Sequence, residues 1–102
     1  MLYTIDLAER KARMIELGQV FVALPGGIGT VDEVMSTLAV LTVNKITKKS
    51  IILVNVEGVF DSLYQQLQAF VGLGLAEKRA VDLVKIAGSA EEALEMIDQL
   101  KL

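Results

Sequence analysis

Apolar residues form continuous runs in some segments and recur every three or four positions in others. The alternation of these two patterns predicts strands separated by helices. The segment 20–24 is a continuous apolar run with β-branched and aromatic members, typical of a strand covered on both faces. The segment 51–56 is predicted as a second fully buried strand and 81–87 as a third. Apolar residues recur at spacings of three and four in segments that predict helices at about 6–17, 30–43, 59–71 and after Ser89. This order implies right-handed crossovers and a three-layer α/β fold in which helices flank a parallel sheet.

The predicted helices differ in how much of their surface is apolar. The helix at 30–43 is apolar nearly all round, which predicts burial on more than one side. The helix at 59–71 is amphipathic, with its apolar face made by Phe60, Leu63, Leu67 and Phe70. Ser89 and Glu92 match a capping box at the start of the last helix. The inward face of that helix is predicted to consist of Ala93, Leu94, Ile97 and Leu100.

The composition restricts the chemistry that this chain can perform. Its 102 residues, predicted to form one domain over 1–102, are 53% apolar and 23% charged, which is typical of a densely packed globular protein. The chain contains no histidine and no cysteine, which excludes disulfides, imidazole or thiolate metal sites and histidine-based catalysis. Any catalysis must therefore use carboxylates, guanidinium groups and backbone amides.

Charge and hydropathy argue against nucleic acids and membranes as partners of this chain. The formal net charge is −3 with no basic block, which argues against a nucleic acid polymer as a partner. The apolar stretches are shorter than the roughly 20 residues that cross a bilayer, and the first residues lack the apolar core of a signal peptide. We therefore expect no membrane association and a cytoplasmic location.

A glycine-rich loop between the first strand and the following helix is the main candidate for a binding site. It consists of Pro25, Gly26, Gly27, Ile28, Gly29 and Thr30. In a parallel sheet, ligands bind beyond the carboxyl ends of the strands, where free helix amides and the helix dipole favour anions by about 0.3–1 kcal/mol. Glycines that adopt positive φ would let the backbone approach a phosphate monoester closely.

Glycine spacing alone does not establish this site. The loop lacks the lysine of a Walker loop and the spacing of the dinucleotide fingerprint. A tight turn without a ligand is therefore an equally good interpretation of the glycines.

Glu33 and Arg10 each have two possible roles. Thr30 and Glu33 match a capping box, but Glu33 would also stand beside the anion site, within reach of a ribose attached to the phosphate. Arg10 falls on the apolar stripe of the helix at 6–17, where its charge would be costly to bury unless it were paired with an anion. Alternatively, Arg10 lies at the edge of the stripe with its guanidinium group in water.

Two sequence motifs occur near the N-terminal end of the chain. The first is Glu9-Arg10-Lys11, and the second runs from Pro25 to Glu33 with the pattern PGGxGTxxE. In this order and at this spacing they resemble the paired signature of the Lonely Guy family, which is often mislabelled as lysine decarboxylase. The segment 53–60 resembles the family's next strand and its Asn-x-x-Gly-aromatic turn. The resemblance extends from about residue 5 to residue 75.

The resemblance implies an activity and roles for particular residues. Members of the family hydrolyse the N-glycosidic bond of nucleoside 5′-monophosphates, such as cytokinin ribotides or AMP, to a free base and ribose 5-phosphate. Arg10 and Glu33 match the catalytic residues, with Glu33 stabilising an oxocarbenium-like state. The resemblance assigns phosphate and substrate binding to Lys11, Gly26, Gly27, Ile28, Gly29 and Thr30. No cofactor or metal is implied, and no residues resemble a pyridoxal phosphate site.

The chain also departs from the family pattern. Family members are nearly twice as long, so the resemblance implies a Rossmann-like fold without the N-terminal half that supplies the first strands and a second glycine-rich turn. Ala8 stands where many relatives have histidine, and the helix at 30–43 lacks the family's tryptophan.

These departures affect the expected assembly and leave alternatives open. Without the neighbouring strands, 20–24 would present an apolar edge, and together with the apolar helix at 30–43 this predicts a homo-oligomer. The chain could instead be a catalytically inactive nucleotide-binding or assembly module. It could also be one part of a protein whose other half is a separate chain.

Overall fold

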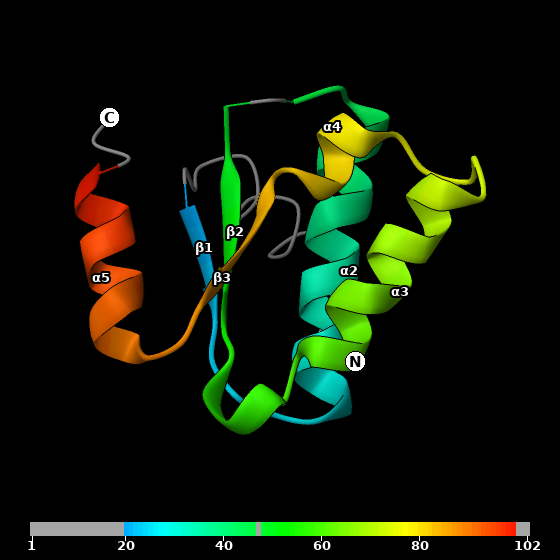
Figure 1. The fold of residues 1–102 in the computed structure, drawn as a ribbon. Helices are drawn as coiled ribbons and strands as arrows, with labels where there is room; N and C mark the ends of the chain where they lie inside the picture. Colours follow the sequence, from blue (N-terminus) through cyan, green and yellow to red (C-terminus); the bar gives the residue numbers. More distant parts are fainter. Residues whose placement is uncertain (1–19, 47, 100–102) are drawn as a thin grey trace, which may run out of the picture.

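A computed structural model describes residues 20–46 and 48–99 of the chain (Figure 1). The predicted helix at 6–17, which contains Arg10 and Lys11, lies outside the described residues. None of the helices in the described part is both long enough and apolar enough to cross a membrane.

The described chain is built around a parallel sheet of three strands. These are β1 (Val20–Ala23), β2 (Ser50–Val54) and β3 (Val84–Ala87), in the spatial order β1-β2-β3. Phe21 is in register with Ile51, which is in register with Val84. All residues of β2 are buried, because it is paired on both edges and residues of the flanking helices cover both of its faces.

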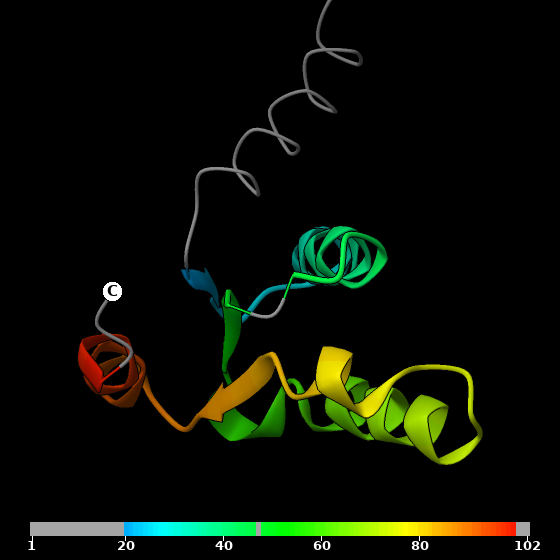
Figure 2. The same cartoon turned by 90° about the horizontal axis from the view of Figure 1, so that it is seen from above.

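Helices cover both faces of the sheet, which confirms the predicted three-layer α/β fold. Their bounds are α2 (Ile28–Val43), α3 (Asp61–Gly72), α4 (Lys78–Val81) and α5 (Ala90–Gln99), with a 3₁₀ turn η1 (Val56–Gly58) after β2. Figures 1 and 2 show α2, α3 and α4 on one side of the sheet and α5 on the other.

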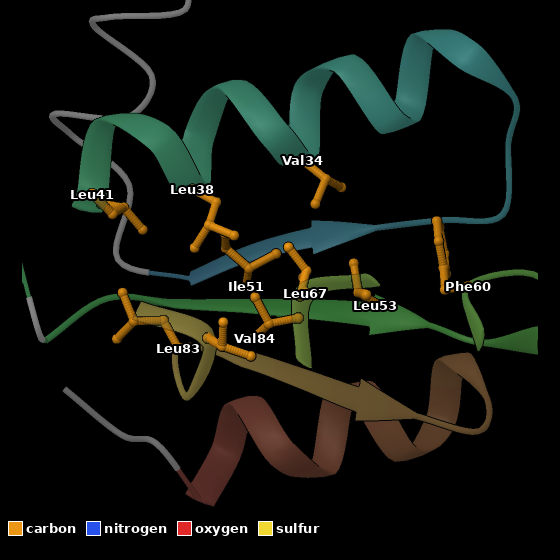
Figure 3. Close-up of a cluster of buried hydrophobic side chains, with 10 residues drawn as sticks. Val34, Leu38, Leu41, Ile51, Leu53, Phe60, Leu67, Leu83 and Val84 are labelled. Carbon is orange, nitrogen blue, oxygen red and sulfur yellow. The ribbon is translucent and has the colours of Figure 1, made fainter. Parts of the chain in front are cut away.

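Alternate residues of β2 supply the two halves of the core. Ile51 and Leu53 belong to the larger cluster, on the side of α2 and α3 (Figure 3), whereas Ile52 and Val54 pack on the side of α5 with Ala87 and Ala93. The strand period of two therefore divides one apolar run between two layers.

The prediction that strand 20–24 is covered on both faces is wrong for β1. Val20, Phe21 and Ala23 are half-buried, and Val22 is 42% exposed. Among the described residues, β1 is an edge strand that pairs only with β2. The prediction that the helix at 30–43 is buried on more than one side is also wrong. Only Val34, Thr37, Leu38 and Leu41 of α2 are buried, and Val43 is 79% exposed.

The second strand ends earlier than predicted because Asn55 turns the chain. The side-chain oxygen of Asn55 accepts a hydrogen bond from Phe60 N at 2.6 Å, and its amide nitrogen donates to Asp61 Oδ1 at 2.7 Å. Glu57 and Gly58 between them have φ values of 55° and 71°. Val56, predicted as strand, therefore lies in η1, and α3 begins at Asp61 rather than at residue 59.

The predicted third strand, 81–87, is only half correct. Val81 ends α4 and is buried there, and β3 begins at Val84. A short apolar run has no periodicity that separates a buried helical turn from a strand.

Ser89 caps the last helix as predicted. Glu92 N donates to Ser89 Oγ at 3.1 Å, and the Glu92 carboxylate accepts a hydrogen bond from Gly88 N at 2.9 Å. The predicted inward face is correct for Ala93 and Ile97 but wrong for Leu94, which is 65% exposed. Leu100 lies outside the described residues.

Candidate functional site

The carboxyl ends of the three strands lie at the same edge of the sheet, at the bottom of Figure 1, and α2, α3 and α5 all begin there. The glycine-rich loop, residues 25–30, joins β1 to α2 at this edge. Residues 25–29 are exposed to solvent, and Ile28 is 91% exposed. The loop therefore lies where parallel α/β proteins bind ligands.

Helix α2 begins with unpaired amides. Its N-cap is Gly27, and the first intrahelical hydrogen bond is donated by Val31 N to Gly27 O at 3.2 Å. The preceding N–H groups, those of Ile28, Gly29 and Thr30, therefore have no acceptor within the helix. Such amides, together with the positive end of the helix dipole, favour an anion.

The capping-box interpretation of Thr30 and Glu33 is wrong. Thr30 is the third residue of α2 rather than its N-cap, and no side chain hydrogen-bonds at the N-cap of this helix. A glutamate can reach back to the cap only from the third helical position, and Glu33 is beyond it. The Glu33 carboxylate is therefore not used to cap α2.

The glycines of the loop do not adopt the positive φ that we expected. Among the described residues, positive φ at glycine occurs at Gly58 and Gly74. Gly26 is instead closely packed, because a Cβ there would collide with Thr30 Oγ1 and lie 3.2 Å from Thr30 Cβ, so the Thr30 side chain would have to shift. A Cβ at Gly27 or Gly29 would meet no atom within 4 Å. These two positions leave the backbone open to an approaching ligand.

A hollow of about 300 Å³ lies between β1 and α2, beside the loop. It is lined by Val20, Phe21, Val22, Ala23, Thr30, Glu33, Val34, Thr37 and Ile51. The α2 residues among them are three, four and seven positions from Thr30, the spacing of one helix face. The structure thus brings Thr30 and Glu33 to one hollow next to the unpaired amides.

Thr37 was missed by the sequence interpretation. It follows Thr30 by seven residues, or about two helical turns, so helical spacing contained the signal. Arg10 and Lys11 lie outside the described residues, and the structure does not place them. Among residues 20–46 and 48–99, no acidic cluster of three or more groups is arranged to hold a metal ion.

The fold and the site define an α/β protein with an exposed glycine-rich loop between a strand and a helix N-terminus. Comparison with protein families gives a more specific result. The family model described as "Possible lysine decarboxylase" matches residues 1–97, and the chain belongs to this family.

Several curated relatives of the chain are plant enzymes. Cytokinin riboside 5′-monophosphate phosphoribohydrolase LOG1 of Arabidopsis thaliana is 32% identical over 93 residues, which cover 91% of this chain and 43% of the relative. LOG3 of the same plant is 30% identical over 94 residues, covering 92% and 43%. The probable enzyme LOGL2 of Oryza sativa subsp. japonica is 30% identical over 94 residues, covering 92% and 38%. The chain therefore spans less than half the length of these relatives.

Proposed function

We propose that this chain hydrolyses the N-glycosidic bond of a nucleoside 5′-monophosphate, releasing a free base and ribose 5-phosphate. The phosphoribohydrolase activity for which the similar plant enzymes are named supports the reaction class. The observation that carries the proposal is that Glu33 lines the hollow beside the unpaired amides of α2. The substrate is AMP or a cytokinin ribotide.

The 5′-phosphate is bound by the N–H groups of Ile28, Gly29 and Thr30, next to the Thr30 hydroxyl. As the bond between the base and C1′ breaks, positive charge develops on the ribose. The Glu33 carboxylate, one helical turn from the amides, stabilises this charge. The oxygen of a water molecule bonds to C1′, and one proton of that water is transferred to the base nitrogen that leaves. By family resemblance, Arg10 orients the anionic oxygens and Lys11 contributes to phosphate binding.

The test of this proposal is incubation of the chain with AMP, followed by chromatographic detection of adenine and ribose 5-phosphate. Formation of both products in equal amounts is expected. Absence of both would leave the chain without the proposed activity.

A second candidate function is nucleotide binding without turnover. The observation that favours it is that the unpaired amides at the start of α2 can accept a phosphate without any contribution from Glu33. In that case AMP raises the melting temperature of the chain but no adenine is released.

Replacing Gly29 with alanine should separate stability from phosphate binding. Gly29 is helical and a Cβ there meets no atom of the chain, so Gly29→Ala should stabilise the fold by about 0.5–1 kcal/mol. The same Cβ would intrude on the space in front of the amides and weaken one or two charged hydrogen bonds, lowering the affinity for AMP about tenfold or more. Thermal unfolding and titration calorimetry measure the two effects.

The matched control for Gly29→Ala is Gly72→Ala. Gly72 also lies in a helix, at the end of α3, with no atom within 4 Å of an added Cβ. This control should leave AMP binding unchanged. Equal AMP affinity in the wild type and Gly29→Ala would mean that the phosphate does not bind at these amides.

We further propose that the chain forms a homo-oligomer. The exposed surface of α2 carries Ile28, Val31 and Val43, and exposed Val22 lies on the neighbouring β1. Apolar surface of this kind on a small domain is typical of protein interfaces. Light scattering should give a multiple of the 11.1 kDa chain mass, and a single species of that mass would contradict the proposal.

A further inference from the structure

Thr37 is a buried residue whose hydroxyl group makes no hydrogen bond to the described residues. Its side chain lies on α2, one turn beyond Glu33, and the residue is only 6% exposed. Thr42 on the same helix behaves differently, because its hydroxyl donates to Leu38 O at 2.7 Å. Buried polar side chains usually have a partner. Water or a ligand in the adjoining space can supply the partner of the Thr37 hydroxyl.

The hollow between β1 and α2 is the place from which such a partner can come. Thr37 lines this hollow together with Thr30 and Glu33. Within the described part, every fully enclosed polar atom of a side chain has a hydrogen-bond partner. The unpartnered hydroxyl of Thr37 must therefore retain contact with the hollow, where a ligand can reach it.

The order of groups along α2 matches the order of groups in a nucleotide. The free amides lie at the start of the helix, Glu33 lies roughly 5 Å further along the axis than Thr30, and Thr37 lies roughly 6 Å beyond Glu33. In a nucleoside 5′-monophosphate the ribose lies between the phosphate and the base. With the phosphate at the amides and the ribose near Glu33, the base reaches Thr37.

The walls around Thr37 suit a flat heteroaromatic ring. Phe21, Val34 and Ile51 line the hollow with apolar groups. The transfer of the apolar faces of a base from water into the hollow therefore costs little free energy. We propose that the Thr37 hydroxyl hydrogen-bonds to the polar edge of a purine base and is a specificity-determining residue of this site. This inference rests on the proposed function, because it requires the phosphate at the start of α2.

The test compares two ligands that differ in the base. The full chain is titrated calorimetrically with AMP and with ribose 5-phosphate, in the wild type and in the variants Thr37→Val, Thr37→Ser and Thr42→Val. Thr37→Val keeps the shape of the side chain but removes the hydroxyl, and it should lower AMP affinity about three- to tenfold, the effect of one hydrogen bond. Ribose 5-phosphate affinity should not change.

The other two variants serve as controls. Thr37→Ser retains the hydroxyl and should restore AMP binding, whereas Thr42→Val removes a hydroxyl that does not line the hollow and should leave both affinities unchanged. The inference is overturned if Thr37→Val changes both affinities equally or neither. It is also overturned, with the phosphate site intact, if the wild type binds both ligands equally. If the wild type binds neither ligand, the proposed function fails as well.

Discussion

Glu33→Gln is expected to lower the rate of adenine release from AMP by about 10²–10³-fold, because the neutral amide cannot stabilise the positive charge that develops on the ribose. Glutamine has nearly the same size, so the hollow should keep its shape and AMP should still bind. The measurements are the initial rate of adenine release and the dissociation constant of AMP. The effect should appear in kcat rather than in binding, since the interaction strengthens only as the bond breaks.

The control for Glu33→Gln is Glu95→Gln. Glu95 is an exposed glutamate on α5, on the opposite side of the sheet from α2. The same change of charge at this position should leave the rate unaltered. Adenine release by Glu33→Gln at the wild-type rate would show that the carboxylate has no catalytic role, and the remaining candidate would be binding without turnover.

Leu53→Ala should strongly destabilise the fold. Leu53 is fully buried in β2 and belongs to the larger core cluster, between the sheet and α2 (Figure 3). Removing its side chain should cost about 3–5 kcal/mol, because apolar contacts are lost and a cavity remains. For a domain of this size, that cost corresponds to a fall in melting temperature of roughly 15–30 °C. Thermal unfolding followed by circular dichroism measures it.

Leu94→Ala is the matched control, because it makes the same substitution at an exposed position of α5. The free energy of unfolding should change by less than about 0.5 kcal/mol, as for most surface substitutions. Similar losses in the two variants would mean that Leu94 is buried, as the helical period predicted, and that α5 packs on the sheet through a different face.

Local chemistry explains why several features were predictable. The glycine-rich loop follows an apolar strand directly and precedes a helical pattern, so its place at the carboxyl edge follows from chain order alone. Ser89 and Glu92 are close in the chain, and their capping interactions depend on a few backbone atoms. The spacing of three between Thr30 and Glu33 likewise places both on one face of a helix.

Other features depend on what lies opposite a residue. The apolar character of Leu94 and Val43 is the same whether a neighbour covers them or not, and in this structure both are exposed. Val81 lies in a helical turn rather than a strand because α4 buries it against the core. Sequence periodicity shows which side chains favour burial, but it does not show whether another element covers them.

The amino-acid sequence by itself determined the alternation of the three strands with α2, α3 and α5, the location of the glycine-rich loop and the lack of histidine and cysteine side chains, since these depend on local spacing and residue type. Only the tertiary structure decided that β1 forms one wall of a hollow and that Glu33 and Thr37 line it. Those properties arise from the packing of segments far apart in the chain, which no local pattern encodes.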